Sequence, residues 1–132
     1  MPEARIDQLL AAARARIERV RPEALVAEQA AGALVIDIRP EANRRDEGEV
    51  PGALVVELVH FMWRLDPTSP DRLPEVTPDS RVIVMCNEGY ASSLAAAQLQ
   101  ELGLERSADL EGGARAWFRH IADEDLADPG ET

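Results

Sequence analysis

The sequence predicts an α/β domain, a three-layer sandwich in which a small, mostly parallel sheet carries helices on both faces. Two β-branched runs, 33–38 and 81–85, are typical of strands that are buried on both sides. Helical segments lie between and after these runs, and strands that alternate with helices favour parallel pairing. Right-handed crossovers then place helices on both faces of the sheet.

Composition narrows the function before any motif is considered. The chain of 132 residues has the length of one domain, and its hydrophobic content of 45% is sufficient for a core. Its formal net charge of −11 argues against nucleic acid and anionic membranes as partners, because phosphate binding needs an excess of basic residues. We find neither an apolar stretch of membrane-spanning length nor a secretory signal, and therefore expect a cytoplasmic protein. The oligomeric state is left open.

Three regions are expected along the chain. An N-terminal helix, residues 1–21, is predicted because apolar residues recur at helical spacing from Ile6 to Val20. We expect this helix to pack on the main domain, residues 22–122. The acidic segment 123–132 ends in Pro-Gly-Glu-Thr and is expected to fray.

Turn signals divide the main domain into alternating elements. Pro22 suits the first turn of a helix that Gly32 ends, and Ser92 or Ser93 is expected to cap a later helix. The polar, charged stretch 41–49 carries no predicted element. The expected order is a helix at 22–31, strands at 33–38 and 54–56, a helix at 57–65, a loop at 66–79, a strand at 81–85, a helix at 94–102, a strand at 108–110 and a helix at 114–121.

The only cysteine, Cys86, lies at the C-terminal end of the strand 81–85, before a glycine-containing loop and a helix. Ligands of open α/β sheets bind at the carboxyl ends of the strands. A helix N-terminus adds free N–H groups and the positive end of its dipole, so a thiol placed there is activated as a thiolate. Gly89 allows the loop to turn tightly. A buried, inert cysteine in a plain α/β domain is the alternative.

Four segments resemble, in order, the motifs of the rhodanese homology domain. Residues 34–39, Leu-Val-Ile-Asp-Ile-Arg, resemble its strand ending in Asp-x-Arg, and residues 48–53, Gly-Glu-Val-Pro-Gly-Ala, resemble its Gly-His-Ile-Pro-Gly-Ala turn. Residues 82–92 resemble its active-site strand and Cys-x-x-Gly-x-x-Ser loop, and 110–117 its closing Leu-x-Gly-Gly…Trp. The resemblance covers about residues 24–120 and implies the rhodanese-like fold.

The resemblance also implies a sulfurtransferase of the thiosulfate sulfurtransferase type. Cys86 would take sulfane sulfur from a small donor as a persulfide, and a thiol or protein acceptor would remove it. Neither a cofactor nor a metal is expected, since one cysteine and two distant histidines make a poor metal site. The loop residues that would hold the persulfide through their backbone amides are Asn87, Glu88, Gly89, Tyr90, Ala91 and Ser92.

The loop departs from basic members of the family, because it carries Glu88 and no arginine. A carboxylate near the sulfur disfavours the thiolate and repels the thiosulfate dianion, so an organic or protein persulfide is favoured as the donor, with thiosulfate as the alternative. Cysteine phosphatases of related fold carry arginine six residues after the cysteine, where this chain has Ser92, and phosphatase activity is not expected. A non-catalytic rhodanese-like module that binds a partner or senses redox state is the alternative.

Four residues outside the loop are candidates for supporting the site. Asp37 and Arg39 end a strand at the same edge of the sheet, where a structural ion pair is the simpler interpretation. Arg44 and Arg64 are candidates for a positive field near the pocket, although most surface arginines have no such role. Tyr90 is expected to form a pocket wall or to dock a partner, and an exposed loop aromatic without such a role is the alternative.

Overall fold

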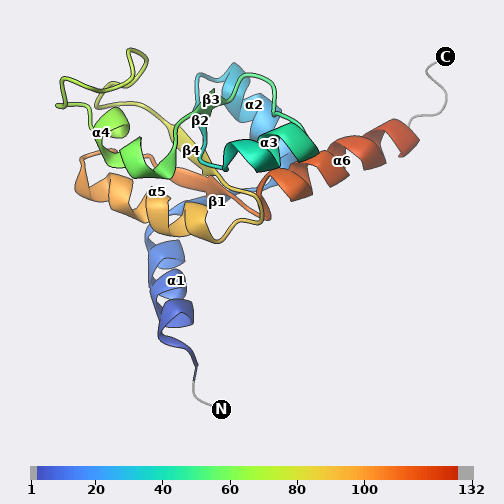
Figure 1. Ribbon diagram of the computed structural model, residues 1–132, viewed down its shortest axis with the longest axis horizontal. Coiled ribbons are helices and arrows are strands. Elements are labelled where there is room, and N and C mark those ends of the chain that lie inside the picture. Colours follow the sequence, from blue (N-terminus) through green and yellow to red (C-terminus); the bar gives the residue numbers. More distant parts are fainter. Residues whose placement is uncertain (1–2, 128–132) are drawn as a thin grey trace.

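A five-stranded parallel sheet forms the centre of the structure, a computed structural model that describes residues 3–127 (Figure 1). The strand order is β1-β5-β4-β2-β3, and every pairing between neighbours is parallel. All residues of β4 and β5 are buried, as expected for strands that are covered on both faces. The predicted α/β fold is confirmed. The strands are β1 (Glu18–Val20), β2 (Leu34–Asp37), β3 (Leu54–Val55), β4 (Val82–Met85) and β5 (Ala108–Leu110).

Helices cover both faces of this sheet and divide the core into two clusters. Because side chains alternate along a strand, Val82 and Val84 of β4 join a cluster with α4 and α5. Ile83 and Met85 join the other, with α2 and α6. In the described part of the chain, no helix combines the length and the apolar character needed to cross a membrane. The α-helices are α1 (Arg5–Arg16), α2 (Leu25–Ala30), α3 (Glu41–Glu47), α4 (Phe61–Leu65), α5 (Ala91–Glu101) and α6 (Gly113–Ala127), and short 3-10 turns, η1 (Pro22–Ala24) and η2 (Leu58–His60), precede α2 and α4.

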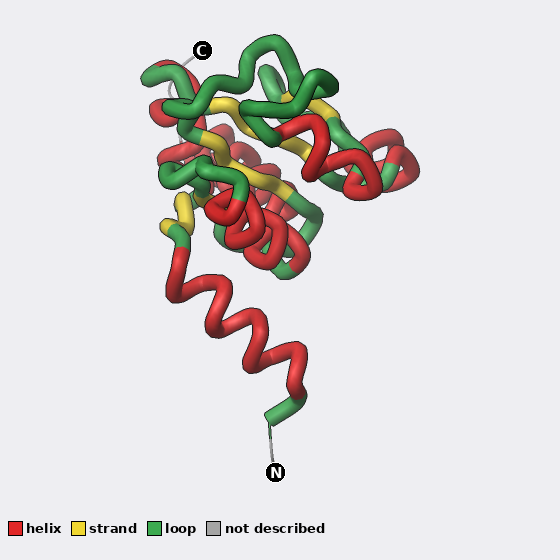
Figure 2. Tube along the Cα trace, turned by 90° about the vertical axis from the view of Figure 1, so that its left-hand side faces the viewer, coloured by secondary structure: helices red, strands yellow, loops and turns green. Residues whose placement is uncertain are grey.

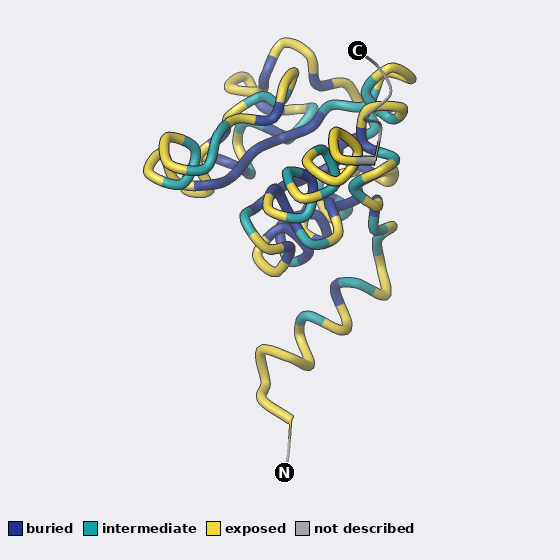
Figure 3. Tube along the Cα trace, turned by 90° about the vertical axis from the view of Figure 1, so that its right-hand side faces the viewer, coloured by how far each residue is buried: buried dark blue, intermediate teal, exposed yellow. Residues whose placement is uncertain are grey.

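The N-terminal segment differs from the sequence prediction. Helix α1 ends at Arg16, and residues 18–20 form β1, which pairs with β5 at the edge of the sheet. The prediction of one helix up to residue 21 is therefore wrong at its end, because the open edge of β5 offers hydrogen bonds that the spacing of apolar residues does not reveal. Helix α1 projects from the body of the molecule (Figure 2) and contacts α5. Most of it is exposed (Figure 3), and Ala13 is its one buried residue.

Two further differences concern helices with weak hydrophobic signals. Helix α3 forms in the stretch for which no element was predicted, and none of its residues is buried. Its charges suit the helix dipole, with Glu41 in the first turn and Arg44 and Arg45 in the last. Helix α6 continues to Ala127, so the expected frayed tail is helical up to that residue. The remainder of that tail, 128–132, lies outside the described residues.

Candidate active site

Cys86 follows β4 directly, and a loop of four residues separates it from α5. Its Sγ accepts the backbone N–H of Gly89 at 3.1 Å and that of Ser92, in the first turn of α5, at 3.4 Å. The side chain is almost buried, with 8% of its surface exposed. The predicted strand end, loop and helix start are therefore present. Two amides converge on the sulfur, as in sites that hold an anion at a helix N-terminus.

The start of α6 and the turn that precedes it support the cysteine loop. The N–H of Ala114 donates to the carbonyl of Cys86 at 2.9 Å, and the N–H of Arg115 donates to that of Asn87 at 3.1 Å. Gly89 has φ of +86°, and a Cβ there would lie 2.8 Å from the backbone nitrogen of Gly112. The loop and the Gly-Gly turn thus approach each other more closely than any side chain at Gly89 permits. The Leu-x-Gly-Gly motif, the last of the four sequence motifs, thus packs directly against the cysteine loop.

A buried carboxylate that sequence reasoning missed anchors α5 to the sheet. Asp109 of β5 is fully buried and accepts the hydroxyls of Ser92 at 2.9 Å and Ser93 at 2.7 Å. Arg19 of β1 pairs with the same carboxylate at 3.0 Å. The expected serine cap is therefore wrong: Tyr90 occupies the N-cap position without a side-chain cap, and both hydroxyls point to Asp109 instead. The signal in the sequence was a single aspartate within the otherwise apolar strand at 108–110.

The acidic side chain of the loop is paired. Arg115 of α6 lies 3.0 Å from Glu88 and 2.8 Å from Glu47 of α3. Hydrogen bonds from Arg115, and less so from Asn43 and Asn87, lower the pKa of Glu47 to about 2. The same bond to Glu47 raises the pKa of Arg115. The charge of Glu88 is thus partly offset at the surface, where such pairs are screened by solvent.

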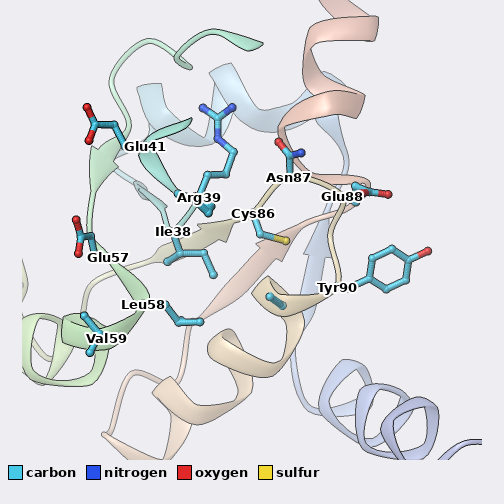
Figure 4. A pocket seen from close by; sticks show the side chains of 12 residues that line it. Ile38, Arg39, Glu41, Glu57, Leu58, Val59, Cys86, Asn87, Glu88 and Tyr90 are labelled. Atoms are coloured by element: carbon cyan, nitrogen blue, oxygen red, sulfur yellow. The ribbon is translucent and has the colours of Figure 1, made fainter. Parts of the chain in front are cut away.

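A cavity of about 620 Å³ opens over Cys86 (Figure 4). Figure 4 shows Glu88 and Tyr90 on one side of the sulfur, with Glu41 and Glu57 on the other. Tyr90 is thus a pocket wall and is also 59% exposed. Among residues 3–127, no three side chains of His, Cys, Asp or Glu are grouped closely enough to hold a metal ion. The apolar part of the wall includes Ile38, Leu58, Val59 and Ala91.

The four candidate residues outside the loop form hydrogen bonds or ion pairs with other parts of the domain. Arg39 and Asp37 form an ion pair of 2.9 Å in which both side chains are buried, as the structural interpretation predicted. Arg39 lines the cavity, but its guanidinium also donates to Gly48. Arg44 donates to the carbonyl of Arg39, and Arg64 to a carbonyl in the loop at 66–79. Neither Arg44 nor Arg64 belongs to the cavity wall described above.

Comparisons with known proteins agree with this architecture. The model of the rhodanese-like domain matches residues 21–120. A sulfurtransferase from Allochromatium vinosum is 34% identical over 87 residues, 66% of this chain and 73% of that protein. The thiosulfate sulfurtransferase GlpE of Stutzerimonas stutzeri is 29% identical over 109 residues, 83% of this chain and 91% of that protein.

A solved structure from Rhodopseudomonas palustris, described as a protein of unknown function and possible tyrosine phosphatase, is similar over almost the whole chain. Its TM-score is 0.80 at 28% identity, covering 92% of this chain and 96% of that one. The family model covers well over half of the sequence, and this chain belongs to the rhodanese-like domain family.

Proposed function

We propose that the protein is a sulfurtransferase that carries sulfane sulfur as a persulfide on Cys86. The observation that carries this proposal is the pair of amides, from Gly89 and Ser92, that donate to Sγ at the floor of an open cavity. Donors fixed in this way stabilise a thiolate before the reaction and the negative charge that moves to the outer sulfur during it. The names of the curated relatives support the same chemistry.

The proposed reaction has two nucleophilic steps and no net oxidation. In the first, the Cys86 thiolate attacks the outer sulfur of a donor R–S–SH. The bond between Cys86 Sγ and that sulfur forms, the S–S bond of the donor breaks, and its electron pair leaves with R–S⁻. In the second, an acceptor thiolate attacks the outer sulfur of Cys86–S–SH, becomes the new persulfide and releases the Cys86 thiolate. The intermediate is covalent, and ping-pong kinetics are expected.

Charge at the cavity mouth favours a persulfide over thiosulfate as the donor. Glu41 and Glu57 line the side of the cavity opposite Glu88, and the one arginine among the lining residues, Arg39, is neutralised by Asp37 in a buried pair. A dianion therefore enters against a negative field, whereas an organic or protein persulfide meets a largely apolar wall. The acceptor is a thiol, free or carried by a protein.

The test is sulfur loading followed by intact mass. Wild-type protein is incubated with thiosulfate or, separately, with cysteine persulfide, and its mass is expected to rise by one sulfur atom, faster with the persulfide. Cys86→Ser is the matched control and gains nothing. Absence of loading by either donor overturns the proposal and favours the alternative, a module that binds a partner or senses redox state without transferring sulfur.

Phosphatase activity is not proposed, although the Rhodopseudomonas protein is described as a possible tyrosine phosphatase. A phosphate clamp needs a guanidinium on the loop that faces the ligand. The sixth residue after Cys86 is Ser92, whose hydroxyl is committed to the buried Asp109. We expect no hydrolysis of p-nitrophenyl phosphate under conditions in which the protein accepts sulfur.

A further inference from the structure

We propose that Arg14 of α1 is a positioning residue for the Cys86 loop, which it supplies with the positive charge that the loop lacks. The proposal deepens the sulfurtransferase function above and rests on it for one of its two readouts. Arg14 precedes the region matched by the family model, which begins at residue 21. The site would therefore be completed by a segment outside that region.

Gly89 connects this arginine to the sulfur. The carbonyl of Gly89 accepts Arg14 Nη2 at 2.8 Å and Arg19 Nη2 at 2.9 Å, while its N–H donates to Cys86 Sγ. The two guanidinium groups fix the peptide unit that follows Gly89, and the bond to the sulfur fixes the unit that precedes it, so the backbone of this residue is held from both sides. Because hydrogen bonds to a charged donor are stronger than neutral ones, they hold the loop in the form that binds the sulfur.

The two arginines differ in their remaining partners. Arg19 is an ion-pair partner of the buried Asp109, so most of its charge is compensated. Arg14 has no carboxylate within ion-pair distance among the residues that the structure describes; its Nε donates to the Ser93 hydroxyl at 3.1 Å. Its guanidinium also lies 5.5 Å from the ring centre of Tyr90. Arg14 is therefore a half-buried cation beside the loop that has no ion-pair partner among the described side chains, and its contacts with Gly89, Ser93 and Tyr90 fix its position.

The balance of charges around the Cys86 loop explains why the guanidinium of Arg14 matters for the thiolate. The carboxylates outnumber the arginines, and three of the arginines, Arg19, Arg39 and Arg115, are committed to ion pairs with them. A positive group beside the loop opposes this negative field and stabilises the thiolate and the persulfide anion. The charged or titratable side chains near the sulfur are Arg14 from α1, Arg19 from β1, Asp109 from β5, Glu47 from α3, Arg115 from α6, Glu88 and Tyr90 in the loop, Asp37 and Arg39 from the end of β2, and Glu41 and Glu57 at the cavity wall.

The contact with Tyr90 gives Arg14 a second effect. Tyr90 lines the cavity, and Figure 4 shows its ring extending from the loop away from Glu41 and Glu57. A cation over the ring holds it as a wall of the cavity and restricts its movement as a free side chain. Loss of Arg14 is therefore expected to raise KM for a donor that contacts this wall, in addition to lowering kcat.

The experiment compares Arg14→Gln and Arg14→Lys with Arg16→Gln. Arg16 is the matched control, because it lies on the same helix and donates to Ala97 of α5 at 3.4 Å, but it makes no contact with the loop among those described. The first readout is the rate of iodoacetamide alkylation of native Cys86 against pH. Arg14→Gln is expected to move the midpoint upward by about half to one pH unit. Arg14→Lys is expected to restore at least half of that shift, and Arg16→Gln to leave the midpoint unchanged.

The second readout is sulfur loading from cysteine persulfide, for which kcat/KM is expected to fall about fivefold in Arg14→Gln. Thermal unfolding of each variant shows whether the fold keeps its stability. The proposal is overturned if Arg14→Gln and Arg16→Gln share one alkylation profile. It is equally overturned if the lysine and glutamine variants shift the profile by the same amount, which is the result of a purely structural role. Wild-type protein that accepts no sulfur refutes the proposed function, while the alkylation comparison still decides the role of Arg14.

Discussion

Replacement of Gly89 by alanine tests how the loop is packed against the turn before α6. The new Cβ would lie 2.8 Å from the nitrogen of Gly112 and 3.2 Å from that of Gly113 and from Nη2 of Arg19. The nearest of these atoms belong to the backbone, so the loop itself must move. Its movement displaces the N–H that donates to Cys86 Sγ. Both stability and access to the sulfur are therefore expected to change.

The magnitude follows from a comparison with Gly103, at the end of α5. Gly89 and Gly103 have φ of +86° and +92°, and a Cβ at Gly103 meets nothing within 4 Å. Left-handed backbone costs alanine about 1–2 kcal/mol, which is the whole expected loss for Gly103→Ala. The contact with backbone adds about 1–3 kcal/mol at Gly89, by analogy with overpacked cores. Gly89→Ala is therefore expected to lower the free energy of unfolding by about 2–5 kcal/mol.

Urea denaturation, followed by the fluorescence of the buried Trp117, measures both losses. The difference between the two variants isolates the contact, because the change from glycine to alanine has the same effect on the unfolded chain at both positions. Sulfur loading is expected to fall in Gly89→Ala and to remain in Gly103→Ala. Equal losses of stability, or loading that is unchanged in Gly89→Ala, would refute the tight approach of loop and turn.

Three further perturbations test the charged network. Asp37→Ala leaves the buried guanidinium of Arg39 without its partner, and the free energy of unfolding is expected to fall by about 3–5 kcal/mol in urea denaturation. Asp109→Ala removes the carboxylate that ties α5 to the sheet, with an expected loss of about 3 kcal/mol and faster alkylation of the native thiol. For Glu47, the folded-state pKa of about 2 lies below the usual 4.5, so its stabilising contribution is complete above pH 4.5 and is lost as the pH falls toward 2. Glu47→Gln is expected to flatten that part of the stability profile measured by thermal unfolding.

Each of these expectations has a contrary result. A loss below about 1 kcal/mol in Asp37→Ala would mean that water reaches Arg39, as at an exposed pair. An unchanged rate of thiol alkylation in Asp109→Ala would show that this carboxylate does not determine the position of the Cys86 loop. A profile of Glu47→Gln that is parallel to that of the wild type between pH 4.5 and 2 would assign the acid sensitivity to other carboxylates.

The features of the fold and the site that could be predicted from the sequence are those encoded by residues close together in the chain. The strands β2 and β4 are continuous apolar runs, and Cys86, Gly89 and the Gly-Gly turn lie within a few residues of one another or in recognisable motifs. Helix α3 escaped prediction because it buries none of its residues, and β1 because three residues acquire strand geometry from the edge of β5. The contacts of Arg14 and Arg19 with the loop span 75 and 70 residues, a separation over which no periodicity or spacing carries information.

The position of β1 has a consequence for any shorter version of this chain. A protein that began with the family's matched region, at residue 21, would lose β1 and leave β5 with a row of unpaired backbone groups. Such an open strand is a template on which another copy can add its own strand and start aggregation. In the whole chain the outer strand is β1, which is three residues long and carries the charged residues Glu18 and Arg19. A short, charged edge strand discourages pairing with a strand of another molecule. The N-terminal segment therefore also protects the sheet against self-association.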